Sequence, residues 1–237
     1  MSQELMMARR EIFGVLAGGV AALLAGCGLF GRDSYRFKMT VELETPDGLR
    51  SGSSVYRVRA WRTSDLMTGG SGSDTELRGE AVAVDLPGGK TLFALLRTGS
   101  ATNWEGDLPE VSMRTLDPAF NYDRAESVAR IASGDGIRSP AEVALADYPL
   151  LVTFRNHSDP TSVERVDPAN LAVTFGTRVR LRRITIEVTD DAVTSGIDKR
   201  LKWLRAHRGT LKPNPPRFMD DPSDPELRLL GTGPFST

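Results

Sequence analysis

Residues 35–44, YRFKMTVELE, alternate strictly between apolar and polar side chains. This period of two is that of a β-strand with one buried side and one side facing solvent. A turn signal follows at Asp47-Gly48, and residues 55–61, VYRVRAW, repeat the alternation. Because a short turn joins antiparallel neighbours, the two segments are predicted to pair as a hairpin. The pattern therefore predicts a core built on antiparallel sheet.

More strands and a few short helices are predicted along the rest of the chain. Residues 79–97 indicate two strands joined at 87–90, so the first third is expected to be an antiparallel meander, with a flexible Gly/Ser-rich excursion at 63–79. Residues 148–154, YPLLVTF, indicate a buried strand. Helices are predicted at 124–132 with Asp123 as cap, from Ser139-Pro140, from Asp167-Pro168 to near Gly176, and at 196–204. The expected fold class is α+β, mainly antiparallel β-sheet of meander or sandwich type with a few short helices.

The segment 178–188, RVRLRRITIEV, changes phase in its middle. Its apolar residues fall on odd positions before the change and on even positions after it, at Val179, Leu181, Ile184, Ile186 and Val188. One extra residue in a strand reverses the alternation, so a β-bulge at Arg182-Arg183 would bring all of them to one side. We predict that bulge.

Two stretches show neither a helical nor a strand period. Residues 98–122 carry scattered apolar side chains and are expected to form an ordered loop packed on the body. Residues 207–237 contain six prolines and are predicted to be a tail, either disordered or laid along the domain. The organisation predicted is a single globular domain over 35–206 followed by this tail.

The chain has a single cysteine, Cys27, and it follows an uncharged and mostly apolar run, 12–24, that Arg9 and Arg10 precede. This is the anatomy of a signal peptide. The run resembles the signal of bacterial lipoproteins, with a lipobox at Leu24, Ala25, Gly26 and Cys27. The resemblance implies cleavage between Gly26 and Cys27, removal of 1–26 and lipidation of Cys27. The alternative is an uncleaved membrane anchor over 12–30.

The same domain is exported whether the signal is cleaved or stays as an anchor. Residues 27–34 make a short tether, in which the seven residues after the cysteine, 28–34, reach about 24 Å at full extension, so the domain is expected to lie close to the membrane that anchors it. In many bacterial lipoproteins an acidic residue directly after the cysteine retains the protein at the inner membrane. Here Gly28 stands at that position, which favours anchoring in the outer membrane, with the domain facing the periplasm. The arginine pair also resembles a loose twin-arginine signal, so the export route stays open. With its one cysteine lipidated the chain forms no intrachain disulfide, and burial has to stabilise it.

The charge balance and the motif search exclude several classes of function. Lys plus Arg number 30 against 31 Asp plus Glu, which argues against a dedicated nucleic-acid binder. His157 and His207 have no partners at zinc spacing, PGGKT at 87–91 reads as a hairpin turn rather than a phosphate loop, and no serine-hydrolase motif is present. The pairs Asp190-Asp191 and Asp220-Asp221 are interpreted as solvated carboxylates. No metal or cofactor is predicted.

One constellation of charged residues suggests a binding surface. Under the predicted face assignments the basic side chains that point outward are Arg36, Lys38, Arg57, Arg59, Arg178, Arg180 and Arg182. Together they would make a basic face near the bilayer, suited to anionic headgroups, to lipopolysaccharide phosphates or to an acidic partner protein. The alternative is neutralisation by cross-strand pairing with Glu42, Glu44 and Glu187.

The runs DPTSVERVDPANLAVTFG, 159–176, and RVRLRRITIEVTDDAVTSGI, 178–197, resemble a family of uncharacterised proteobacterial proteins. That resemblance implies no activity. Three classes of function stay open. The first is a lipid-anchored, non-catalytic envelope protein that binds a partner or an anionic component. The others are an envelope enzyme with a site in the 98–122 loop and a structural subunit of an envelope assembly.

Overall fold

The computed structural model describes residues 33–64, 71–98, 108–211 and 230–237. The chain divides into two units, Met1–Gly31 and Arg32–Thr237, and the fold described below is that of the second. The predicted signal peptide 1–26 and Cys27 lie outside the described residues. Ser34, the last residue of the predicted tether, already begins the first strand.

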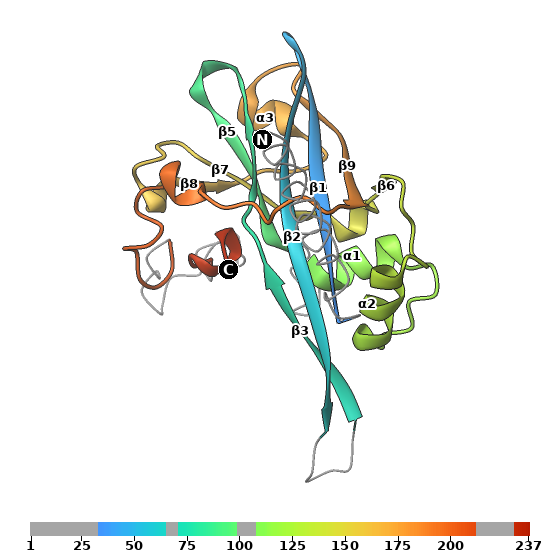
Figure 1. Cartoon of the computed structure of the whole chain (residues 1–237). Coiled ribbons are helices and arrows are strands. Elements are labelled where there is room, and N and C mark those ends of the chain that lie inside the picture. The colour runs from blue at the N-terminus through green and yellow to red at the C-terminus, as the bar shows by residue number, and fades with distance from the viewer. Residues whose placement is uncertain (1–32, 65–70, 99–107, 212–229) are drawn as a thin grey trace, which may run out of the picture. The chain divides into compact units, whose positions relative to one another are not determined.

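The strands form two antiparallel sheets, which confirms the predicted fold class (Figure 1). The long sheet has the order β3-β2-β1-β9-β6, with strands β1 (Ser34–Thr45), β2 (Gly48–Ser64), β3 (Ser71–Arg78), β6 (Ala141–Glu142) and β9 (Arg180–Val188). The short sheet has the order β4-β5-β7-β8, with strands β4 (Val82–Asp85), β5 (Thr91–Thr98), β7 (Pro149–Phe154) and β8 (Val163–Arg165).

Short helices connect these strands. The α-helices are α1 (Leu108–Leu116), α2 (Arg124–Ser133) and α3 (Leu171–Phe175). Single 3₁₀ turns are η2 (Pro87–Gly89), η3 (Leu145–Asp147), η4 (Pro160–Ser162), η5 (Ile197–Lys199) and η6 (Gly233–Phe235). Helix α2 begins where the sequence predicts, because the Asp123 side chain accepts a hydrogen bond from the Glu126 N–H and caps its first turn. Among the described helices, none is long and apolar enough to cross a membrane.

The predicted hairpin is present as strands β1 and β2. The two strands pair from Ser34 opposite Arg59 to Thr45 opposite Gly48, around a turn at 46–47. The alternation decides which side is buried: Phe37, Met39, Val41 and Leu43 are fully buried, and the polar residues between them are not. We call the side with these apolar residues the inner face of the long sheet and the opposite side its outer face.

The predicted bulge in β9 is confirmed. Glu42 lies opposite Arg183 while its neighbour Leu43 lies opposite Leu181, which leaves Arg182 as the extra residue. Leu181 and Ile184 therefore share the inner face, as the phase change in the sequence requires.

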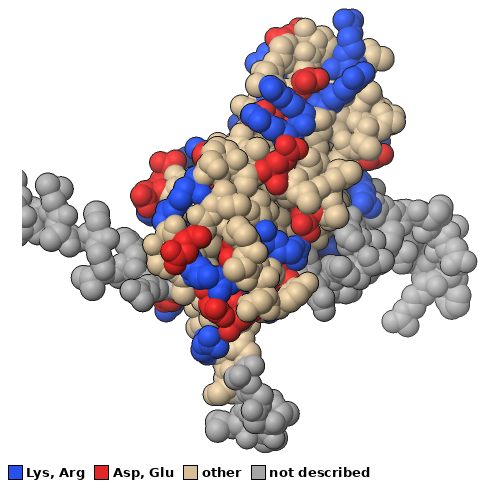
Figure 2. All heavy atoms as spheres, turned by 90° about the vertical axis from the view of Figure 1, so that its right-hand side faces the viewer, with Lys and Arg blue, Asp and Glu red and all other residues tan. Residues whose placement is uncertain are grey.

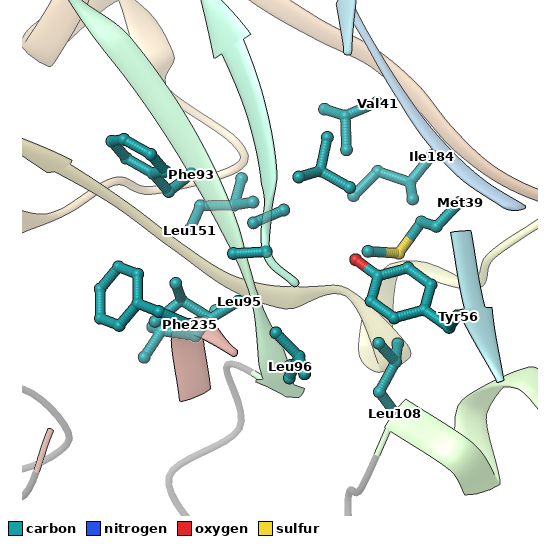
Figure 3. Close-up of a cluster of buried hydrophobic side chains, with 14 of the residues drawn as sticks. Met39, Val41, Tyr56, Phe93, Leu95, Leu96, Leu108, Leu151, Ile184 and Phe235 are labelled. Carbon is teal, nitrogen blue, oxygen red and sulfur yellow. The ribbon is translucent and has the colours of Figure 1, made fainter. Parts of the chain in front are cut away.

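Apolar side chains pack on both faces of the short sheet. On one face lies the inner face of the long sheet, with Met39, Val41 and Ile184; helices α1 and α2 cover the rest of that inner face (Figures 1 and 3). On the other face Phe93 meets Phe235 in an edge-to-face ring contact at 6.3 Å (Figure 3). Buried on both sides, β7 reads as an almost unbroken apolar run, PLLVTF.

The two sheets touch most closely where β2 crosses β4. A Cβ atom placed on Gly52 would come 2.2 Å from the Ala83 carbonyl oxygen, so only glycine allows this approach. Beside it, the Ser54 hydroxyl donates to the Glu80 carbonyl at 2.8 Å. The crossing fixes the position of β2 on the short sheet.

Several expectations are wrong. The predicted excursion 63–79 contains β3, which pairs with β2, and the first third is not one meander because β4 and β5 leave for the second sheet. The predicted loop 98–122 contains the buried helix α1. No helix starts at Ser139-Pro140, where the chain instead enters β6. Residues 196–204 form the 3₁₀ turn η5 and further turns rather than one helix.

The end of the predicted tail is part of the core. Phe235 is fully buried among Phe93, Phe154 and Trp203. Backbone hydrogen bonds hold this end in place, from Ala81 N–H to the Phe235 carbonyl and from Thr237 N–H to the Gly79 carbonyl. The C-terminal residues thus close the second face of the short sheet.

Truncation of Phe235 tests this contribution. We expect Phe235→Ala to lower the free energy of unfolding by about 3–5 kcal/mol, because a large buried aromatic side chain leaves a cavity. Val173, 81% exposed, is the control, and Val173→Ala is expected to change stability by less than about 0.5 kcal/mol. Urea unfolding followed by circular dichroism measures both. Equal stability of the two variants would show that the C-terminal end does not belong to the core.

Candidate functional site

The outer face of the long sheet carries the predicted basic residues, and three arginines lie in one row across it. Arg36 on β1 lies opposite Arg57 on β2, which lies opposite Arg78 on β3. Like charges directly opposite each other destabilise a sheet. The row therefore needs carboxylates nearby.

A segment that leaves β9 supplies some of these carboxylates. It crosses the outer face, since the Thr189 N–H donates to the Arg36 carbonyl on β1 and the Thr194 N–H donates to the Val55 carbonyl on β2. In Figure 1 it is the thin orange trace that crosses β1 and β2. The crossing brings Asp190 to 3.9 Å from the Arg36 guanidinium. The Asp190-Asp191 pair thus lies beside a basic row that it partly neutralises.

Most of the predicted basic residues near the start of β1 are ion-paired. Lys38 is 2.5 Å from Glu187, and this hydrogen bond raises the pKa of the Lys38 ammonium. Arg59 is 3.1 Å from Asp33. The alternative of neutralisation therefore holds for this part of the face.

Neutralisation continues further along the sheet at Glu42. Arg183 holds this carboxylate with two hydrogen bonds of 2.9 Å, which lower the pKa of the Glu42 carboxyl. Arg182 lies 3.7 Å from the same carboxylate. Glu42 thus forms ion pairs with two arginines, and one of them, Arg182, is the extra residue of the bulge.

The predicted basic residues do not form one continuous patch. Arg180 lies opposite Glu44, eight residues along β1 from Arg36 and so about 27 Å away. Arg178 and Arg180 are therefore at the end of the sheet where β1 turns into β2, far from the start of β1. The expectation of a single basic face near the tether is wrong in this respect.

Exposed arginines gather at that turn end. Arg50, Arg178 and Arg180 are all exposed, and within the described residues none of the three takes part in an ion pair. We call this set the arginine end. Figure 2 shows blue side chains concentrated at the top, where Figure 1 places the turn between β1 and β2. Glu44, exposed opposite Arg180, is the nearest carboxylate by register.

Two details of the arginine end were not foreseen. Arg178 adopts φ 75°, a left-handed conformation that is uncommon for residues other than glycine and often marks functional positions. Arg50 was not among the predicted basic residues because the alternation that predicts the second strand starts only at Val55, whereas β2 begins at Gly48. The pairing of Leu43 with Arg50 shows that the strand continues.

A second cluster of polar and charged residues joins the segment after α1, within the predicted loop 98–122, to helix α2. Asp117, only 3% exposed, accepts hydrogen bonds from Arg130 at 2.7 Å and from the Ser127 hydroxyl at 2.6 Å. Burial opposes ionisation of Asp117, but these hydrogen bonds and one from the Ala119 N–H lower the pKa of its carboxyl. The groups bond to one another, so the cluster is a contact between helices.

Helix α1 also takes part in a buried hydrogen bond between two hydroxyl groups. The Tyr35 hydroxyl and Ser112 Oγ are 2.6 Å apart, and Ser112 Oγ donates to the Pro109 carbonyl, so Tyr35 is the donor to Ser112. Burial raises the pKa of the Tyr35 phenol, so that it stays protonated. This bond fixes α1 on the inner face of β1.

The two histidines and the PGGKT segment take part in packing and in a turn. The ring of His157 packs against Phe93 and Phe154, and the ring of His207 packs against Trp203. In the part of the chain that the structure describes, no group of three or more His, Cys, Asp or Glu side chains could hold a metal ion. PGGKT joins β4 to β5 as a hairpin turn, and Lys90 donates to the Thr174 carbonyl at 2.7 Å.

No family model, curated protein or solved structure matches the chain.

The contact between α1 and α2 predicts a dependence of stability on pH. The pKa of Asp117 is lower in the folded protein than in the unfolded chain, where it is about 3.9, so its contribution is complete above pH ~4 and is lost as the pH falls through the lowered value. We expect Asp117→Asn to lower the free energy of unfolding by about 2 kcal/mol at pH 7 and by progressively less below pH ~4.

Chemical unfolding across a pH series measures this effect. Asp135→Asn is the control, because Asp135 is exposed on the loop after α2 and has no ion pair within the described residues. A constant difference between wild type and Asp117→Asn at all pH values would contradict the assigned role of the Asp117 charge.

Proposed function

We propose that this chain is an exported, lipid-anchored protein of a bacterial cell envelope, which acts as a non-catalytic binding module for an anionic envelope partner. The anchor rests on the lipobox Leu24–Cys27 and on the apolar run before it. The binding role rests on one observation, the arginine end, whose exposed Arg50, Arg178 and Arg180 form no ion pair within the described residues. Guanidinium groups suit carboxylates and phosphates because they can bind both oxygens of such a group.

The position of the arginine end fits a partner outside the anchoring bilayer. The seven residues after the lipidated cysteine, 28–34, reach about 24 Å at full extension, so the start of β1 stays near the lipid. Strand β1 then runs from Ser34 to Thr45, a length of about 36 Å, and the arginine end lies at its far end. The far end of such a strand can reach a component of the periplasm. With anchoring in the outer membrane, the module faces the periplasm.

The anchor is tested by the intact mass of the protein extracted from membranes. We expect a mass that corresponds to residues 27–237 plus acyl groups. The matched variant Cys27→Ser, expressed in the same cells, should lack this species because the lipid is carried by the cysteine sulfur. A wild-type chain that retains 1–26 without modification would contradict lipidation and favour an uncleaved anchor.

The binding role is tested by photo-cross-linking in intact cells. A photoreactive residue at Leu49, which is 52% exposed beside the arginine end, is expected to capture a discrete partner. We expect the double charge reversal Arg178→Glu with Arg180→Glu to abolish the captured species, because attraction to an anionic partner becomes repulsion.

A remote double reversal provides the control. Arg155 and Arg205, 73% and 84% exposed, lie outside the long sheet, and their replacement by Glu changes the net charge by the same amount. The control should keep the captured species. If both double variants lose it, or neither does, the arginine end is not the binding surface.

A further inference from the structure

Next to the arginine end, strand β2 has an open edge. Strand β1 pairs with β2 on one side from Gly48 to Arg59, whereas β3 pairs with it on the other side only from Arg57 onward. Between these, Thr194 bonds to both the N–H and the carbonyl of Val55. From Gly48 to Ser54 no strand among the described residues pairs with this second side. We call residues Leu49–Ser53 the open edge.

Every second residue of the open edge turns its backbone N–H and carbonyl away from β1. The N–H and carbonyl of Val55 are turned to the side where Thr194 binds them. Alternate residues of a strand turn these groups to the same side, so those of Ser53, Ser51 and Leu49 point along the open edge. Ser51 and Ser53 are exposed. Native edges are commonly protected by proline, by charged side chains or by a covering segment; the sequence of the open edge, LRSGS, has one charged side chain, Arg50, and no proline.

The open edge is also held in place. Gly52 lies against the Ala83 carbonyl with no room for a side chain, and Ser54 is bonded to Glu80. An edge that is fixed before binding loses little conformational freedom when a partner is added. An extended peptide can bind such an edge by adding a strand.

The side chains of the open edge indicate the chemistry of the partner. Arg50 is exposed and forms no ion pair with any residue that the structure describes. Its neighbour Leu49, on the opposite side of the strand, is 52% exposed. A residue added opposite Arg50 would lie within about 5 Å, where opposite charges attract. A second copy of this chain is disfavoured, because edge-to-edge pairing of two β2 strands would bring two arginine ends together.

We propose that an extended acidic segment of a partner protein adds as a strand to the open edge Leu49–Ser53, with a carboxylate facing Arg50 and an apolar side chain facing Leu49. This inference rests on the proposed binding function and specifies its partner and its geometry. Backbone hydrogen bonds provide the attachment, and Arg50 selects for acidic sequence.

The test measures binding of a fluorescent peptide of alternating Glu and Val residues to the purified full-length protein in detergent, by fluorescence anisotropy. The same peptide with alternate backbone nitrogens methylated keeps the charge but cannot add as a strand. Two variants accompany it. Ser51→Pro removes an N–H from the open edge while leaving the bonds to β1, and Arg50→Glu reverses the charge. Ser51→Thr and Arg155→Glu are their controls.

We expect saturable binding of the unmethylated peptide only. Ser51→Pro and Arg50→Glu should each weaken it by about tenfold or more, the effect of losing one hydrogen bond or ion pair at a bound edge, and the controls should bind like wild type. Circular dichroism verifies that Ser51→Pro is folded. If it does not fold, the comparison of the two peptides on the wild-type protein decides.

Equal binding of the methylated peptide, or binding that Ser51→Pro leaves unchanged, would overturn strand addition. Loss of binding in Arg50→Glu alone would also overturn it, while still agreeing with an electrostatic binding surface. If neither peptide binds, the strand proposal is wrong, and the cross-linking result at Leu49 then decides separately whether the arginine end binds a partner at all.

Discussion

Burial of one side of strand β1 is the constraint on which the rest of this structure depends. Its apolar side chains are fully buried at the centre of the long sheet, between β2 and β9. Each buried aliphatic or aromatic side chain of this kind contributes about 1.5–3 kcal/mol. The bulge at Arg182 exists because β9 has to present its apolar residues to the same inner face. Helix α1 is bound to this strand through Tyr35 and Ser112.

The other side of the same strand carries charged side chains, and the structure neutralises them at one end of the sheet more than at the other. Near the start of β1, Asp33, Glu187 and Asp190 lie beside the basic residues. At the turn end the arginines lack such partners in the described residues, and the backbone edge of β2 is open at the same place. A surface that is both basic and able to pair with a strand is suited to an acidic extended partner.

Sequence patterns predicted the elements whose periodicity is local. The β1–β2 hairpin, the cap of α2 at Asp123, the buried strand β7 and the bulge in β9 all follow from side-chain order within a few residues. Strand β3 and helix α1 were not predicted. The β3 sequence SGSDTELR has little strand propensity and is ordered by its pairing with β2, a contact with a remote part of the chain.

The sequence by itself determined that the chain has a single cysteine after an apolar run, so that no intrachain disulfide can form, and that the long sheet has an apolar and a charged side. Each of these depends on residue type and spacing alone. The tertiary structure decided which charges are neutralised, since Asp190 reaches Arg36 only by the path of the segment after β9. It also decided that Arg50 and Arg180 share one end of the sheet, because strand register brings residues from distant parts of the chain together.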